Sequence, residues 1–382
     1  GNDLSFTKGV ERLGIPPLGM TDGPIGVGTA CALSPDVDFP IVSISHNDDF
    51  STSFPCLTAI AATWNEEMAY ENGRALGREV RGRGRDISLS PAINIHRTPL
   101  CGRNFEYFSE DPHLVSCMAV RFIRGIQEND VGACVKHFAA NNQETNRVSV
   151  SVEMDERTLH EIYLPGFKAS VLEGNCVALM GAYNRLRGVY CCQNKYLLSD
   201  IARNEWGFDG IFITDWGGLH DTKGGIYAGT DIEMSCSPYF DDYFYAKPLK
   251  SQIESGELSE ELLDTMVRRI LKVMFELKIF DSDRKKGVYN SHLNIKTSLQ
   301  VARESVVLLK NDRSILPLSE KKVNKIAVIG ENAEYLHANS GGSSGINALY
   351  EINPLMGLKM YLGGNTKVVY TQSRTSGSFT KY

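Results

Sequence analysis

The sequence predicts an α/β protein, with a (β/α)8-type barrel followed by the beginning of a second α/β domain. Two observations support this. Over the first 280 residues, short and almost continuously apolar runs alternate with amphipathic helical segments, as in repeated β-α units around a buried parallel sheet. After a polar stretch the alternation resumes, with only two further strand candidates before Tyr382. An open, doubly wound sheet is the alternative arrangement of the same elements.

The predicted barrel strands lack the alternation of a half-exposed strand, which indicates that both of their faces are covered. They are "DISLSPAINI" (86–95), "GACVKHF" (132–138), "CVALMGAYN" (176–184) and "GIFITDW" (210–216). The second region contributes "KIAVIG" (325–330) and "TKVVYT" (366–371). A parallel sheet usually has more than two strands, so we expect this second domain to be incomplete in the chain.

The predicted helices carry apolar residues at a spacing of about 3.6 residues. Three of their apolar faces comprise Trp64, Met68, Leu76 and Val80, then Leu114, Met118, Phe122 and Ile126, then Leu159, Ile162, Tyr163 and Phe167. The clearest helix has Ser259 at its expected N-cap and an apolar face of Leu262, Met266, Ile270, Met274 and Leu277. Further helices are expected at 297–311 and near 353–363. We therefore expect a barrel at 1–282, a linker at 283–296 and a partial α/β domain at 297–382.

Composition excludes several classes of protein. The 382 residues suit two domains, and the absence of an apolar run of about 18 residues argues against a membrane span. The net charge of −6 argues against a nucleic-acid surface, and the basic run "DRKK" (283–286) is expected to be a solvated part of the linker. No signal peptide is visible, which favours the cytoplasm but leaves the compartment unknown. A homo-oligomer remains possible.

The nine cysteines are scattered and form no C-x-x-C pair. This spacing is typical neither of a zinc site nor of a disulfide framework. Most of them are therefore expected to be small buried apolar residues.

Polar side chains follow the predicted strands at the ends where a barrel holds its catalytic residues. They are Asp22, Arg103, Asn104, Glu106, Glu110, Asp111, Lys136, His137, Tyr183, Asn184, Asp215 and Trp216. Carboxylates and cations can bind adjacent hydroxyl groups, and an indole can lie against the apolar face of a sugar ring. The pattern predicts a site for a polyhydroxylated substrate.

Each of these residues also has a purely structural interpretation. Asp215 is equally compatible with a cap on the following helix. Lys136 fits one half of a buried ion pair, or the Schiff-base lysine of an aldolase-like barrel. His137 and Tyr183, taken alone, are typical core residues.

Two further features favour structural roles. Arg103 is expected to form a salt bridge with at least one of Glu106 and Asp111. The segment "SGGSSG" (340–345) is similar to a phosphate-binding loop but lacks the pattern G-x-x-x-x-G-K-[ST], so a flexible loop is the better interpretation.

Six segments together resemble glycoside hydrolase family 3, the β-glucosidase group. They occur in the family's order, span nearly the whole chain, and are "MTDGP" (20–24), "GRNFEYFSEDP" (102–112), "VKHFAANNQETNR" (135–147), "LMGAYNRLRG" (179–188), "EWGFDGIFITDW" (205–216) and "ARESVVLLKND" (302–312). The resemblance implies a (β/α)8-type barrel followed by an (α/β)6 sandwich. It also implies retaining hydrolysis of a β-glucoside or short β-linked oligosaccharide through a covalent glycosyl-enzyme, without metal or cofactor.

The resemblance assigns roles to individual positions. Asp215 of "TDW" matches the nucleophile, Tyr183 of "AYN" a tyrosine close to it, and Trp216 an aromatic wall of the sugar site. The positions that match ligands of glycone hydroxyl groups are Asp22, Arg103, Lys136 and His137. Asp215 must be ionised to attack, and cationic neighbours such as Lys136 and Arg103 are expected to lower its pKa.

The second carboxyl group of a retaining glycosidase is not identified in this chain. In the family it usually lies in the second domain, well beyond the nucleophile, and neither Glu331 nor Glu351 stands in a matching motif. The branch that uses a histidine instead has it in the loop "KHFPGHG", whereas this chain reads "KHFAANNQETNR". We expect the acid/base from sequence not shown or from a second chain.

The sequence thus predicts an exo-acting β-glucosidase. A β-xylosidase or a broad β-glycosidase is the alternative within the class, since one pocket wall can distinguish the two sugars. A sugar-binding fragment without catalysis and a Schiff-base enzyme using Lys136 are the alternatives outside it.

Overall fold

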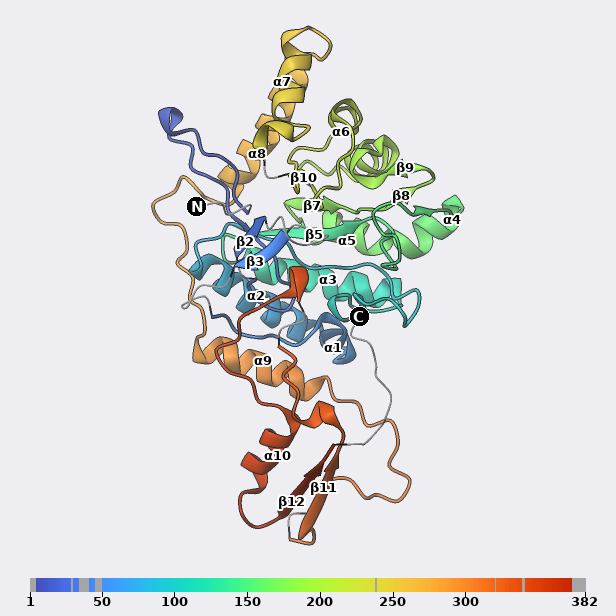
Figure 1. Cartoon of the computed structure of the whole chain (residues 1–382), viewed down its shortest axis with the longest axis vertical. Helices are drawn as coiled ribbons and strands as arrows, with labels where there is room; N and C mark the ends of the chain where they lie inside the picture. Colours follow the sequence, from blue (N-terminus) through green and yellow to red (C-terminus); the bar gives the residue numbers. More distant parts are fainter. Residues whose placement is uncertain are drawn as a thin grey trace.

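The computed structural model describes residues 5–28, 30–33, 41–44, 50–237, 239–319, 321–338 and 341–372. Figure 1 shows an elongated molecule. The N-terminal sheet and its helices form the larger mass, and the last two strands lie at the opposite end, with α9 (His292–Glu304) between them.

The central sheet has five parallel strands whose order in space follows their order in the chain. They are β1 (Met20–Thr21), β4 (Ile87–Ser88), β5 (Gly132–Phe138), β7 (Ala178–Gly181) and β10 (Ile211–Thr214). A single parallel bridge from Ile213 to Ile232 extends the sheet beyond β10. This curled half-barrel confirms an α/β fold. A doubly wound sheet would contain a point where the strand order reverses. Among these five strands the order does not reverse.

The four predicted strands of this sheet are present, and β5 has the bounds that its apolar run predicts. Every residue of β5, β7 and β10 is buried, as expected for strands covered on both faces. The shorter β1 was not predicted, because two residues show no periodicity. Two small sheets were also not predicted; their strands are β2 (Ala30–Leu33) with β3 (Ile41–Ile44), and β6 (Ser151–Val152) with β8 (Arg185–Leu186) and β9 (Val189–Tyr190).

Helices cover the sheet, and several of them begin at side-chain caps. Asn65, Asp111 and Ser259 accept from the second backbone N–H of α2 (Glu66–Gly82), α3 (Pro112–Gln127) and α8 (Glu260–Glu276). The remaining helices of the N-terminal region are α1 (Leu57–Ala62), α4 (Glu156–Thr158), α5 (Pro165–Leu172), α6 (Thr222–Ala228), α7 (Lys247–Glu254), the π-helices η3 (Leu159–Tyr163) and η5 (Tyr196–Glu205), and the 3₁₀ turns η1 (Glu11–Leu13), η2 (Asn104–Glu106), η4 (Cys191–Gln193) and η6 (Phe240–Asp242).

Helices α2 and α3 approach each other closely through glycine. A Cβ added at Gly73 would lie 2.2 Å from the carbonyl oxygen of Phe122, and one added at Gly125 would lie 2.2 Å from that of Tyr70. The two backbones are therefore in direct contact, which leaves no room for a side chain at either position.

Two predictions about apolar faces are wrong at single positions. Trp64 precedes α2, has φ 53° and is 78% exposed, because Asn65 caps the helix one residue later. Ile162 is 38% exposed, because the chain adopts a π-helical turn at η3 and the 3.6-residue spacing is lost there.

The helix predicted at 297–311 starts earlier and ends earlier. Ser291 accepts from the backbone N–H of Asn294, so α9 begins at His292, inside the stretch predicted as a linker. The helix ends at Glu304, before Val306 and Val307, whose β-branched side chains disfavour helix.

The basic run at 283–286 is not simply solvated. Arg284 Nη1 lies 2.6 Å from Asp86 Oδ1 and its Nη2 donates to the carbonyl oxygen of Asp130, with only 11% of the side chain exposed. Asp86 Oδ1 also accepts from Arg81 at 3.0 Å, and Oδ2 accepts from the backbone N–H of Gly19 at 2.7 Å. Arg284 thus attaches this stretch to the residues that precede β4 and β5, at the N-terminal ends of these strands.

The C-terminal part (residues 305–372) contains both predicted strands and the predicted helix. β11 (Lys325–Ile329) pairs in parallel with β12 (Lys367–Thr371), and α10 (Pro354–Leu362) begins at an Asn353 cap. Two 3₁₀ turns, η7 (Glu331–Ala333) and η8 (Gly342–Ser344), complete it.

Within the described ranges, none of the helices has the length and apolar character needed to cross a bilayer. The eight cysteines described are unpaired, and five of them are buried, as predicted for most.

Candidate active site

Asp215 follows the last residue of β10 and holds its carboxylate in an asymmetric environment. Oδ1 accepts from the backbone N–H of Trp216 at 3.0 Å. Oδ2 is buried and has no hydrogen-bond partner among the residues that the structure describes. The cap on α6 is Asp221, not Asp215, so the helix-cap interpretation of Asp215 is wrong. A buried carboxylate oxygen without a partner calls for an explanation beyond structural support.

His137 lies beside this oxygen but does not form an ion pair with it. Its Nε2 is 3.6 Å from Asp215 Oδ2 and 3.0 Å from Arg103 Nη2. A guanidinium can only donate, so Nε2 accepts, and the ring proton is on Nδ1, which faces Asn94 Oδ1 at 3.4 Å. Burial, followed by the charges of Arg103 and Lys136, holds the pKa of His137 well below its usual value. The imidazole is therefore neutral.

Arg103 is held by a carboxylate on its other side. Its Nε donates to Glu106, which is 1% exposed. Burial is the largest single influence on Arg103 and acts against its charge, but Glu106, Tyr107, Asp215 and Glu144 together outweigh it, and the pKa of the guanidinium lies well above its usual value. The predicted salt bridge thus involves Glu106, whereas Asp111 caps α3.

Lys136 and Asp22 form a buried ion pair. Lys136 Nζ lies 2.8 Å from Asp22 Oδ1, and their side chains are 1% and 7% exposed. Burial lowers the pKa of Lys136, but Asp22 and Glu106 together outweigh this effect and the net shift is upward. A charged lysine is not a nucleophile, so this geometry disfavours the Schiff-base alternative.

The pKa of Asp215 is set by opposing influences. Burial raises it, and Arg103, Lys136 and the hydroxyl of Tyr183 lower it, with burial the larger influence. The predicted lowering by the cationic neighbours is confirmed, but desolvation outweighs it and the net shift is upward. Tyr183 is itself buried, which together with Asp215 raises the pKa of its phenol well above the usual value, so it stays protonated beside the carboxylate.

Trp216 is adjacent to Asp215 and almost completely buried. It is 6% exposed and packs with Ile213, Ile232 and Met234. Its indole Nε1 has no hydrogen-bond partner among the described residues. The role of an aromatic wall stays a prediction.

Three residues of the site were missed. Arg147 lies over the ring of Tyr183, 4.8 Å from its centroid, and helps to lower the pKa of Asp215. From the C-terminal part, Ser343 Oγ lies 3.5 Å from Arg103 Nη2, and Ser344 Oγ donates to Glu106 at 3.3 Å. Ser344 is 3% exposed and held by that carboxylate, so this end of the segment 340–345 is fixed against the N-terminal region. Residue 340 lies outside the described residues, and flexibility of the loop stays a prediction. Arg147 stands in a motif that resembles the family, whereas the serines show no local signal.

Family models match both regions of the chain. The glycosyl hydrolase family 3 N terminal domain matches residues 43–273, and the glycosyl hydrolase family 3 C-terminal domain matches residues 306–377. The chain belongs to glycosyl hydrolase family 3, which confirms the resemblance of its motifs.

Relatives and solved structures agree with this assignment. The chain is 40% identical to beta-glucosidase BoGH3A of Bacteroides ovatus, over 97% of this chain and 50% of that protein. It is 38% identical to an exo-alpha-(1->6)-L-arabinopyranosidase of Bifidobacterium longum, over 91% of this chain and 45% of that protein. The structure of beta-glucosidase 3B from Thermotoga neapolitana in complex with glucose matches with a TM-score of 0.84 and 38% identity, over 95% of this chain and 49% of that one. The chain spans about half the length of these relatives.

Proposed function

We propose that this chain carries the nucleophile and the glycone-binding residues of a retaining, exo-acting β-glucosidase. The observation that carries the proposal is the unpartnered Oδ2 of Asp215, buried at the end of β10 among groups suited to bind hydroxyls. The proposal includes a (β/α)8-type barrel at 1–282, a linker at 283–296 and the start of an (α/β)6 sandwich at 297–382. The homologous β-glucosidases support it.

In the proposed first step, Oδ2 of Asp215 attacks the anomeric carbon of the terminal sugar. A bond forms between Oδ2 and that carbon while the bond to the leaving-group oxygen breaks, with its electron pair going to the oxygen. Water then attacks the same carbon and loses a proton to the base form of the group that acts as the acid in the first step, while the bond to Oδ2 breaks and its electron pair returns to Asp215. The backbone N–H of Trp216 fixes Oδ1, so that the carboxylate presents Oδ2.

The surrounding side chains are proposed to bind the sugar in the −1 subsite. Asp22, paired with Lys136, accepts from hydroxyl groups, and Lys136, Arg103 and His137 bind further hydroxyl groups. The hydroxyl of Tyr183 lowers the pKa of Asp215 and so helps to keep it ionised, and Trp216 covers one face of the ring.

The proton for the leaving group is proposed to come from another part of the polypeptide or from a second chain. Glu331 is exposed at the end of β11, and Glu351 accepts from the backbone N–H of Ala338 at 2.8 Å, within the C-terminal part. If this is correct, the 382-residue chain cleaves a 2,4-dinitrophenyl β-glucoside, whose leaving group needs no proton. An unactivated methyl β-glucoside should react at least about 10²-fold more slowly than in an enzyme with its acid in place. Hydrolysis of both at normal rates would contradict this part of the proposal.

The nucleophile is tested by labelling. A 2-deoxy-2-fluoro-glucoside with a dinitrophenyl leaving group should form a stable ester, and peptide mass spectrometry should locate it on Asp215. Label on any other carboxylate would overturn the assignment.

A second candidate is a pentopyranosidase. The Bifidobacterium longum relative is named for an L-arabinopyranosyl group, which, like xylose, lacks the hydroxymethyl group of glucose. The ratio of kcat/KM for matched aryl glucosides, xylosides and arabinopyranosides separates the candidates, and a preference for either pentoside would favour the second.

A further inference from the structure

Glu79 is a buried carboxylate outside the proposed catalytic set. It lies near the end of α2 and is 0% exposed. Oε2 accepts from the backbone N–H of Thr52 at 3.1 Å, and Oε1 accepts from Thr52 Oγ1 at 2.5 Å, from the N–H of Asn290 at 2.7 Å and from Asn294 Nδ2 at 3.0 Å. None of these donors is a cation. A buried carboxyl group on which four neutral donors converge favours one fixed arrangement of the segments that supply them.

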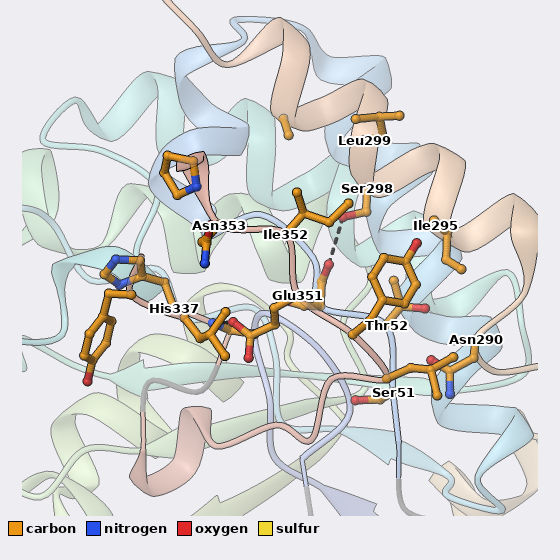
Figure 2. Close-up of a pocket in the computed structure, with 18 residues that line it drawn as sticks. Ser51, Thr52, Asn290, Ile295, Ser298, Leu299, His337, Glu351, Ile352 and Asn353 are labelled. Carbon is orange, nitrogen blue, oxygen red and sulfur yellow. Dashed lines mark hydrogen bonds between the residues drawn. The ribbon is translucent and has the colours of Figure 1, made fainter. Parts of the chain in front are cut away.

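Thr52 belongs to a connecting segment (residues 50–54) in which successive residues bind different parts of the molecule. The N–H of Ser51 donates to the carbonyl oxygen of Asn347 in the C-terminal part at 2.9 Å, and Ser51 and Ala348 form a parallel bridge. The carbonyl oxygen of Ser53 accepts from Ser298 of α9 at 2.8 Å, the dashed line in Figure 2. Glu79 therefore holds the point where α2, α9 and the C-terminal part meet.

Packing alone does not position the C-terminal part against α9. A cavity of about 450 Å³ separates the α9 residues Ile295, Ser298 and Leu299 from the stretches 335–338 and 349–354 (Figure 2). Ser51 and Thr52 lie in its wall. Hydrogen bonds of the connecting segment, in place of a continuous apolar core, thus help to position the C-terminal part against α9.

The segment held by Ser51 continues directly into the candidate active site. Asn347 lies only a few residues after Ser343 and Ser344, which contact Arg103 and Glu106. Between them, Ile346 is 2% exposed and packs so closely that a Cβ added at Gly26 would lie 3.1 Å from it. A displacement of Asn347 would therefore displace the serines.

We propose that Glu79 is a positioning residue for the glycone site. It acts through Thr52 and Ser51 on the loop at 341–348, and so sets how Ser343 and Ser344 lie against Arg103 and Glu106. The inference rests on the proposed function, because it concerns the same site.

Four variants isolate this connection. Glu79→Gln replaces one acceptor oxygen by a donor, and Thr52→Val removes the hydroxyl while keeping the shape of the side chain. Thr52→Ser keeps the hydroxyl and should restore wild-type behaviour. The matched control is Glu304→Ala, which removes the bond to Asn65 at the other end of α9 and leaves the connecting segment intact.

The rate of labelling by the fluorinated glucoside separates affinity from chemistry. In Glu79→Gln and Thr52→Val we expect the inhibition constant KI to rise about three- to tenfold, as for one lost hydrogen bond, while the saturating rate kinact stays within about twofold. Thr52→Ser and Glu304→Ala should match the wild type in both. An unchanged KI, or a loss confined to kinact, would overturn the inference.

Hydrogen exchange supplies a readout that does not depend on turnover. Amides at 341–348 should exchange about tenfold faster in Glu79→Gln and Thr52→Val, with β5 and β10 unchanged. Equal acceleration throughout the chain would show a merely structural role and overturn the inference. If the wild-type chain takes no label, the proposed function fails, and exchange at 341–348 then decides the inference by itself.

Discussion

The two strand-containing regions of this chain have similar apolar runs but bury them to very different extents. All seven residues of β5 are buried, whereas β11 and β12 contain only exposed and half-buried residues. In the C-terminal part Leu309 is 90% exposed and Tyr361 75%. An apolar run thus predicts a strand in both regions, but its burial depends on what other segments cover it. The proposed nucleophile and ion pairs lie in the region where that cover is complete.

The largest expected effect tests whether the chemistry belongs to the N-terminal region. Asp215→Asn removes the attacking charge and should lower kcat on an activated glucoside by about 10⁴-fold or more. Glucose binding, measured by calorimetry, should remain largely intact because the side chain keeps its size. Glu351→Gln in the C-terminal part should change kcat by less than about twofold.

Asp209→Asn is the matched control for Asp215→Asn. Asp209 precedes β10, and its exposed side chain pairs with Lys272. The Asp209→Asn variant should therefore have the kcat of the wild type. Comparable losses in Asp209→Asn or Glu351→Gln would contradict the assignment of the chemistry to the carboxyl end of β10.

Removing an apolar side chain should lower the free energy of unfolding more in the buried N-terminal sheet than in the exposed C-terminal sheet. Phe212 in β10 is 1% exposed and lies against Phe138 and Phe208, so Phe212→Ala should lower the free energy of unfolding by about 3–5 kcal/mol. Ile329 in β11 is 69% exposed, and Ile329→Ala should cost less than about 0.5 kcal/mol. Urea denaturation followed by circular dichroism measures both. Similar costs would show that the C-terminal sheet is covered in solution.

A smaller effect is expected at the stretch that precedes α9. Arg284→Ala removes one of the two guanidinium groups that donate to Asp86 Oδ1, together with the bond to the carbonyl oxygen of Asp130, and should destabilise the chain by about 1–3 kcal/mol. Lys286→Ala, two residues later at an exposed position, should be neutral within about 0.5 kcal/mol. Equal effects in the same denaturation assay would restore the interpretation of this run as a solvated linker.

Sequence patterns predicted the parts of the fold that are set locally. Fully buried parallel strands such as β5 are continuous apolar runs, and the predicted cap at Ser259 marks a helix start. Trp64 was placed wrongly because an apolar period continues across a cap without interruption. Arg284 was placed wrongly because its partner, Asp86, is 198 residues away.

The candidate site likewise contains some residues whose proximity the sequence predicts and others whose contacts it does not. Asp215 follows β10, and Lys136 and His137 lie near the carboxyl end of β5. Parallel strands bring their carboxyl ends to one side of a sheet, so the proximity of these residues was predictable. Ser343 meets Arg103 across 240 residues, and no local pattern encodes that contact. The net pKa of Asp215 was also not predictable, since it depends on how completely the fold removes water from the carboxylate.

The most subtle expected effect is a dependence of stability on the ionisation of Asp215. Its pKa in the folded state lies above that of an unfolded chain, so the folded state binds this proton more tightly. Ionised Asp215 therefore destabilises the fold at pH values above the folded pKa, and the penalty disappears as the pH falls below the unfolded value of about 3.9. Asp215→Asn should thus raise the free energy of unfolding at pH 7 by on the order of 1–2 kcal/mol, with a gain that shrinks toward pH 4. Urea titrations of both proteins across this range test the sign. A variant less stable than the wild type at pH 7 would mean that Arg103 and Lys136 outweigh burial, and that the proposed nucleophile stabilises the region that holds it.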